Sequence, residues 1–340
     1  MNKDIHVVTG ANGRTGFALC AELKARGCFV RALLRTSAEW YRPFLEPYVD
    51  EFVTGDIRER VSLDAAFSGA CCVYHLAGIV SIASAMTAEL EDVNVQGVKN
   101  VIDACLAHRV PRLVHTGTVH TLPFHDTTSI LREIPRYMPD AVQGPYARTK
   151  AIASNLVLDA VTERGLNAVI AMPSGIIGGF ELKRSNLGAM VVDVAEGRLP
   201  VYLKGEYDFV DVRDVARAIA DLATMGPAGE SYILSGHKTS VKELISYAAE
   251  AAGRKPPSLC LPRPLVQAFS YPAEMWALLC GATLVFTPYA IKVLGDNCNF
   301  SHEKISMLTG YTPASVQQAV AEQVKFYFDV YKPMLNGKRL

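Results

Sequence analysis

A tyrosine and a lysine four residues apart are the first residues in this sequence whose types and spacing point to chemistry. Tyr146 and Lys150 lie in the segment PYARTK, which opens a helical pattern, so both side chains lie on one face of the helix. A phenol is a poor base at neutral pH, but a nearby ammonium stabilises the phenolate form. Tyr146 can then act as an acid or a base. Taken alone, this spacing is more typical of an ordinary helix surface.

A glycine-rich turn near the N-terminus favours the catalytic interpretation of Tyr146 and Lys150 over that of an ordinary helix surface. In HVVTGANGRTGFALCAEL, an apolar run enters Gly10, Gly13 and Gly16, and an Ala- and Leu-rich helical pattern follows at once. Gly10 permits the tight turn, Gly13 lets the backbone approach a pyrophosphate, and Gly16 lets the helix pack close to the strand. A strand before the turn and a helix after it are the context that phosphate binding requires. We therefore predict a dinucleotide site and interpret Tyr146 and Lys150 as catalytic.

The residue after the second apolar run bears on which dinucleotide is bound. Residues 28–34 form a strand pattern that is followed by Arg35, where an Asp or Glu would accept the 2′-hydroxyl of the ribose. A guanidinium makes paired, charge-assisted bonds to phosphate oxygens. Arg35, with Arg14 in the turn, therefore predicts NADP, and NAD is the alternative. The competing interpretation of Arg35 is a solvated surface arginine.

The elements that position these residues follow from alternating patterns. Short apolar runs alternate with longer amphipathic stretches, which is typical of βαβ units in a parallel sheet with helices on both faces. The candidate strands are residues 5–9, 28–34, 51–56, 71–77, 112–117 and 167–173. The candidate helices are residues 15–26, 89–108, 147–164 and 213–225. We expect an α/β protein with a Rossmann-type, doubly wound parallel sheet.

Further candidate site residues lie where the strands end, at the edge where open α/β sheets bind ligands. Asp56 and Ile57 would bring a carboxylate and an apolar side chain to the adenine. Leu76, Ala77 and Gly78 close the fourth strand. Thr116 and Thr118 end the fifth, and Thr118 is the predicted hydroxyl that bonds a substrate oxygen.

After Pro173 the pattern changes to a smaller, mostly helical substrate-binding lobe. We expect residues 1–173 to form the dinucleotide-binding domain and residues 174–340 to form the lobe, with a return to the sheet around 207–235. The apolar content of residues 265–291 favours an apolar, ring-containing substrate. The uncharged run within this stretch is too short to span a membrane. It fits a buried helix or a pocket wall, so no membrane insertion is predicted, and contact with a membrane stays open.

Composition excludes several functions. The 34 basic and 34 acidic residues cancel, which leaves no long-range field to hold nucleic acid or an anionic membrane. The eight cysteines lack the spacing of metal ligands, and we expect them to be reduced thiols. With no secretory signal pattern, a cytoplasmic location is expected.

His75, His115 and His120 lie near strand ends without a metal-ligand spacing. We therefore predict no metal and give these histidines packing or pocket-wall roles.

Together these segments resemble the extended short-chain dehydrogenase/reductase family, within the NAD-dependent epimerase/dehydratase superfamily. The resemblance is carried over nearly the whole chain by TGANGRTG, GDI, HLAG, YARTK, MPSGIIG and YDFVDVRDVARAIADL. The dihydroflavonol-reductase and 3β-hydroxysteroid-dehydrogenase-like branch is the most similar. The resemblance also implies a possible homodimer through the helices at residues 89–108 and 147–164.

The resemblance assigns roles to individual residues. Tyr146 would be the catalytic acid/base, and Lys150 would hold the nicotinamide ribose and tune Tyr146. Thr118 would replace the usual serine, and Asn94 would order the active site and its water. The implied cofactor contacts are Gly10, Asn12, Gly13, Arg14, Thr15, Gly16, Arg35, Asp56, Ile57, Leu76, Ala77, Gly78, Thr116, Tyr146, Lys150, Pro173, Ser174 and Ile176.

Three functions fit these residues. The preferred one is an NADP-dependent carbonyl reductase or alcohol dehydrogenase acting on an apolar, ring-containing ketone or alcohol. The second is an NAD-dependent nucleotide-sugar epimerase or dehydratase, which is disfavoured by Arg35 and by Met172, since many relatives have Arg in that place. The third is a non-catalytic regulator that senses a dinucleotide and has no need of Tyr146 and Lys150.

Overall fold

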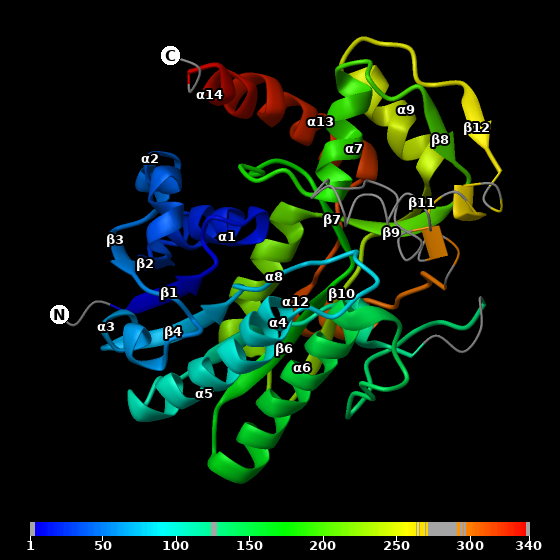
Figure 1. Cartoon of the computed structure of the whole chain (residues 1–340). Coiled ribbons are helices and arrows are strands. Elements are labelled where there is room, and N and C mark those ends of the chain that lie inside the picture. The colour runs from blue at the N-terminus through cyan, green and yellow to red at the C-terminus, as the bar shows by residue number, and fades with distance from the viewer. Residues whose placement is uncertain are drawn as a thin grey trace.

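The computed structural model describes residues 4–123, 128–262, 264, 266–268, 270, 291, 292, 295 and 297–337 (Figure 1). Its main sheet is built from β1 (Ile5–Thr9), β2 (Phe29–Leu34), β3 (Glu51–Thr54), β4 (Ala70–His75), β5 (Leu113–Thr116), β6 (Ala168–Pro173) and β10 (Ser231–Leu234). The seven strands lie in the order β10-β6-β5-β4-β1-β2-β3. Every neighbouring pair is parallel. The doubly wound parallel sheet predicted from the sequence is confirmed.

Helices cover both faces of this sheet. On one face, α1 (Arg14–Ala25) packs against α8 (Val212–Met225), and on the other α5 (Gly97–Ala107) packs against α6 (Gly144–Arg164) (Figure 1). Alternate residues of each strand point to opposite faces, so β1 gives Val7 to one apolar cluster and Val8 to the other. Both faces are therefore buried, which explains why these strands read as nearly continuous apolar runs.

The lobe carries two small sheets and several helices. One sheet joins β7 (Gly175–Ile177), β9 (Glu206–Asp211) and β11 (His237–Ser240), and the other pairs β8 (Val201–Leu203) with β12 (Leu259–Leu261). The main lobe helices are α7 (Asn186–Ala195), α9 (Val241–Ala251) and α13 (Val316–Phe326). Short helices elsewhere are α2 (Arg42–Leu45), α3 (Asp64–Phe67), α4 (Ala88–Glu91), α12 (Glu303–Thr309) and α14 (Lys332–Gly337).

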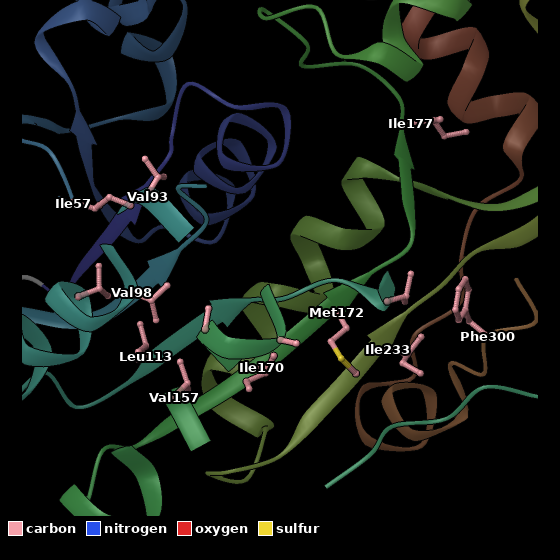
Figure 2. Packing of buried hydrophobic residues seen from close by; sticks show 14 of the residues in the cluster. Ile57, Val93, Val98, Leu113, Val157, Ile170, Met172, Ile177, Ile233 and Phe300 are labelled. Atoms are coloured by element: carbon pink, nitrogen blue, oxygen red, sulfur yellow. The ribbon is translucent and has the colours of Figure 1, made fainter. Parts of the chain in front are cut away.

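One apolar cluster continues from the sheet into the lobe. Figure 2 shows Leu113 and Ile170 of the main sheet in the same cluster as Ile177 and Phe300 of the lobe. Met172 is fully buried within it, and the Tyr137 hydroxyl donates to its sulfur at 3.1 Å. A charged side chain in place of Met172 would therefore need a buried partner.

Two details differ from the sequence expectation. The helix expected at residues 89–108 is interrupted, because a π-helical segment at Asp92–Gln96 separates α4 from α5. The segment YDFVDV belongs to the small sheet as β9, and β10 is the strand that returns to the main sheet. The division into two domains stays a prediction. Residues 265, 269 and 271–290 of the apolar stretch lie outside the described residues, and none of the described helices is long and apolar enough to cross a membrane.

Candidate active site

Tyr146 and Lys150 lie at the start of α6, where that helix meets the end of β5. Both residues are buried, with 9% and 8% of their surface exposed. The Lys150 ammonium donates to the carbonyl oxygen of Thr116 at 2.5 Å, and no carboxylate forms an ion pair with it in the described residues. Burial therefore lowers the pKa of Lys150 to about 8. A positive charge is held one helical turn from the phenol, as the proposed chemistry needs.

Thr118 follows the end of β5 and is buried with its hydroxyl only partly engaged. The backbone N–H of His120 donates to Thr118 Oγ1 at 3.3 Å. This bond uses a lone pair of the hydroxyl oxygen and leaves its proton for another acceptor. The His120 ring in turn packs edge-on against Tyr146, with centroids 6.2 Å apart. His120 therefore contacts both Thr118 and Tyr146.

Asn94 lies in the π-helical segment and ties the loop after β4 to α6. Its side-chain amide donates to the carbonyl of Ile79 at 2.9 Å, and its amide oxygen accepts from the Ile79 N–H at 2.8 Å. It also donates to the Thr149 hydroxyl at 3.2 Å, which donates to the Tyr146 carbonyl at 2.8 Å. Asn94 therefore supports the backbone that carries Tyr146. Single π-helical turns are frequent at functional sites.

The glycine turn has the shape and the donors that a pyrophosphate requires. Gly10 has φ of +72°, and a Cβ there would lie 2.7 Å from the Ala77 nitrogen. A Cβ on Gly16 would overlap the Gly10 carbonyl, so α1 lies directly against the turn. A Cβ on Gly13 would have a single close neighbour among the described residues, the Gly10 carbonyl oxygen at 3.3 Å. Gly13 also gives α1 no side-chain cap, so the first N–H groups of the helix face an open approach.

Asn12 and Thr15 belong to the same region, in the turn and in the first turn of α1, and both are half-buried. A dinucleotide therefore fits here, because the close approach and the uncapped helix end are both present. Asn12 and Thr15 would lie beside it, and their contacts with it stay predictions.

Arg14 makes buried contacts that the sequence did not indicate. Its guanidinium donates to the Ile176 carbonyl at 2.6 Å and forms an ion pair with Glu181 of the lobe. Both side chains of the pair are less than a tenth exposed. Since the charge of Arg14 is already neutralised, the argument for a 2′-phosphate depends on Arg35.

Arg35 lies exposed directly after β2, next to the acidic residue predicted at the adenine. Asp56 accepts three hydrogen bonds from the Arg58 guanidinium, which lower the pKa of the Asp56 carboxyl, and the charge of Arg35 adds to this effect. Ile57 is buried, and its carbonyl accepts from the Asn100 amide at 2.8 Å. An exposed cation thus lies near the predicted adenine position.

The other predicted cofactor residues lie where parallel strands end, along one edge of the sheet. After β4, Leu76 is followed by Ala77, whose N–H donates to Thr9 at 3.3 Å, and by Gly78, which lies against Asn94. Thr116 ends β5 and Pro173 ends β6. Ser174 follows Pro173 and donates to Asp208, and Ile176 lies in β7. This is the edge where open α/β sheets bind ligands.

Three histidines, predicted to have packing or pocket-wall roles, lie near the site. His75 and His115 stack on neighbouring strands with ring centroids 5.5 Å apart. Burial, with the charge of Lys150 adding to it, lowers the pKa of His75 to about 3 and that of His115 well below its ordinary value. Burial also lowers the pKa of His120 to about 4. His120 lies in a short 3-10 turn, Val119–Thr121, which Thr118 caps. No pattern in the sequence predicted this turn or the contact of His120 with Thr118.

Residues 6–235 match the family described as the NAD dependent epimerase/dehydratase family. The chain belongs to this family. The extended short-chain dehydrogenase/reductase resemblance is thereby confirmed, and the protein is an NAD(P)-dependent oxidoreductase. The family membership favours an enzyme over the alternative of a non-catalytic regulator.

Curated relatives and solved structures match most of the chain. The chain is 30% identical over 325 residues to "Sterol demethylase protein B" of Methylococcus capsulatus, covering 94% of this chain and 97% of the relative. It is 30% identical over 285 residues to "3beta-hydroxysteroid-dehydrogenase/decarboxylase isoform 1" of Arabidopsis thaliana, covering 77% and 63%.

Among solved structures, that of gox2253 has a TM-score of 0.83 at 27% identity, covering 96% of this chain and 98% of that one. The UDP-glucuronic acid 4-epimerase of Bacillus cereus in complex with NAD has a TM-score of 0.74 at 16% identity, covering 96% and 99%. The second likeness concerns the fold alone.

Proposed function

We propose that this family member is an NADP-dependent alcohol dehydrogenase or carbonyl reductase whose substrate is an apolar, ring-containing secondary alcohol or ketone of the sterol class. The observation that carries the reaction type is the buried Lys150 ammonium, which has no carboxylate partner in the described residues and lies one helical turn from Tyr146. The sterol class is supported by the names of the two curated relatives.

The reaction divides between the cofactor and the protein. When bound, the nicotinamide ring accepts or supplies the hydride. Thr118 donates its hydroxyl proton to the substrate oxygen and so orients the reacting carbon. Tyr146 removes the hydroxyl proton when an alcohol is oxidised and returns it when a ketone is reduced. The Lys150 ammonium stabilises the phenolate of Tyr146, and Asn94 holds the backbone of the helix turn between them.

Two residues, Met172 and Arg35, support an alcohol dehydrogenase or carbonyl reductase over the nucleotide-sugar alternative. Met172 lies within the apolar cluster, so the chain offers no cation at that position to meet a diphosphate. Arg35 favours NADP, whereas an enzyme that recycles a tightly held NAD has no use for a 2′-phosphate contact. The similarity to solved epimerases concerns the fold, which does not select a reaction.

The test is a turnover assay with NADP(H) and NAD(H) side by side. The panel holds 3-hydroxysteroids, flavonoid-like ketones, simple aromatic ketones and a nucleotide sugar. Because one relative is named a decarboxylase, the steroids are used with and without a carboxyl group on the carbon adjacent to the one that bears the hydroxyl. We expect turnover of an apolar alcohol or ketone with NADP(H). Turnover of the nucleotide sugar alone would overturn the proposal.

Tyr146→Phe is the matched variant for this assay. It keeps the ring and removes the acid/base, so kcat should fall by about 100-fold to 10,000-fold. The dissociation constant of NADPH, measured by fluorescence, should stay close to that of the wild type. Retained turnover would show that Tyr146 is not the acid/base.

A further inference from the structure

His120 contacts both residues whose hydroxyls face the substrate in the proposed function. Its backbone N–H bonds Thr118 Oγ1, and its ring packs edge-on against Tyr146. One residue therefore constrains the hydroxyl that orients the substrate and the phenol that exchanges the proton. Because the reaction needs both groups at matched positions, a small shift of one residue would misplace either of them.

The His120 ring is itself fixed from the lobe. Tyr207 of β9 stacks on it with centroids 5.8 Å apart and an interplanar angle of 15°, and the Tyr207 hydroxyl and His120 Nε2 lie 3.1 Å apart in a hydrogen bond. Tyr207 in turn packs edge-on against Phe209 and Phe300, at 5.9 Å and 6.3 Å between centroids. A continuous aromatic group therefore runs from Tyr146 into the lobe.

We propose that His120 is a positioning residue for Thr118 and Tyr146, and that Tyr207 is the lobe residue that holds His120 in place. This inference rests on the proposed function. It makes the arrangement of the two hydroxyls depend on the lobe, which is the part of the fold that would receive the substrate.

The imidazole acts by shape and by one hydrogen bond, because it is neutral over the working pH range. Burial lowers its pKa to about 4. The titratable side chains packed against it in the described part of the chain are Tyr146 from α6 and Tyr207 from β9. A neutral ring beside Tyr146 leaves Lys150 as the charge that controls the phenol.

The decisive variant is Tyr207→Phe, which removes the hydrogen bond to His120 and keeps the stacked ring. We expect kcat with the best alcohol to fall about three- to tenfold, as for the loss of one hydrogen bond. The KM and the NADPH dissociation constant should change by less than about twofold, since ground-state binding is not affected. His120→Phe should behave similarly, and His120→Ala should lose more because the ring is removed as well.

The pH profile separates positioning from proton transfer. If His120 only positions Tyr146, the ratio of kcat in the wild type to kcat in His120→Phe is constant from about pH 6 to about pH 9. A ratio that changes with pH over this range would overturn the inference, because it would make His120 an acid or a base.

The fold supplies a matched control. His6 and Tyr74 form another stacked and hydrogen-bonded pair, with centroids 5.9 Å apart and a 3.1 Å bond between His6 Nδ1 and the Tyr74 hydroxyl. Tyr74 belongs to the apolar cluster on the opposite face of the sheet from α6. Tyr74→Phe therefore removes the same kind of bond and should leave kcat within about twofold of the wild type while lowering the melting temperature.

Two outcomes overturn the inference in distinguishable ways. An active wild type whose kcat is unchanged by Tyr207→Phe and by His120→Ala removes the positioning role and leaves the proposed function intact. A wild type that turns over no alcohol or ketone with either dinucleotide removes the proposed function and the inference with it.

Discussion

Arg14 and Lys150 are two of the buried cations in this protein, and their surroundings neutralise one charge and not the other. Arg14 and Lys150 are both less than a tenth exposed. Arg14 lies against the carboxylate of Glu181, which also accepts hydrogen bonds from Ser185 and Gln323. Lys150 has a carbonyl oxygen, that of Thr116, and no carboxylate partner in the described residues. The first charge is neutralised, and the second is not.

Buried polar atoms without a hydrogen-bond partner among the described residues lie near both charges, and at Arg14 the Nε of the guanidinium is one of them. Around Lys150, buried polar atoms of four residues have no protein hydrogen-bond partner among the described residues: His75, His115, Thr116 and Ser154. Such groups are rare in cores and cluster where function requires them. Arg14 joins α1 to the lobe and needs a counter-charge, whereas a carboxylate beside Lys150 would cancel the field that stabilises the Tyr146 phenolate. The difference separates a charge that supports the fold from one that supports the chemistry.

The largest expected effect comes from breaking the neutralised pair. Glu181→Gln leaves Arg14 buried without its counter-charge, and removing one partner of a buried pair costs about 3–5 kcal/mol of unfolding free energy. Denaturant unfolding of the free protein measures this. The matched control is Glu303→Gln, whose partner Arg132 lies at the surface, with both side chains 58% exposed. That change should cost less than about 1 kcal/mol. Equal costs in the two variants would show that the Arg14 charge does not depend on Glu181.

The pair also shows where prediction from the sequence ends. The strands, the glycine turn, Tyr146 and Lys150 were predictable, because each depends on residues within a few positions of one another. Arg14 lies in the turn and was assigned to a phosphate, and its contact with Glu181 joins segments with no shared periodicity. A pairing of that kind is fixed by tertiary packing alone.

The same limit applies inside the candidate site. Thr118 was predictable as a hydroxyl at a strand end, but the contact between His120 and Tyr207 again joins distant segments. Asn94 was expected on a regular helix, and the sequence pattern does not distinguish an α-helical turn from the π-helical turn that it occupies. The helix period identifies a face and leaves the local hydrogen bonding open.

The second prediction concerns the charge that is not neutralised. Since burial lowers the pKa of Lys150 to about 8, against about 10.4 in an unfolded chain, the folded protein at pH 7 carries a penalty of up to about 3 kcal/mol. Lys150→Met should therefore raise the unfolding free energy at pH 7 and abolish turnover. Between about pH 8 and about pH 10.4 the unfolded chain binds more protons, so the wild type gains stability as pH rises and the advantage of the variant shrinks.

Unfolding curves at pH 7 and at pH 10 measure both parts of this prediction. The control is Lys99→Met on α5, where the side chain is exposed and the change should stay within about 0.5 kcal/mol at either pH. A variant less stable than the wild type at pH 7 would show that the bond from Lys150 to the Thr116 carbonyl outweighs the cost of burial.

The smallest effect on stability is expected at Arg35, a cation that is neither buried nor paired in the described part of the chain. Arg35→Ala should change the unfolding free energy by less than about 0.5 kcal/mol. It should lower the preference for NADPH over NADH by about 10- to 100-fold, as for the loss of a charge-assisted bond to phosphate. Arg164→Ala, at the far end of α6, is the exposed control and should leave the preference unchanged. A preference that survives Arg35→Ala would transfer the phosphate contact to another residue. Arg14, freed from Glu181 when the cofactor binds, would be the first to test, and the contrast between Arg14 and Lys150 would then hold only for the free protein.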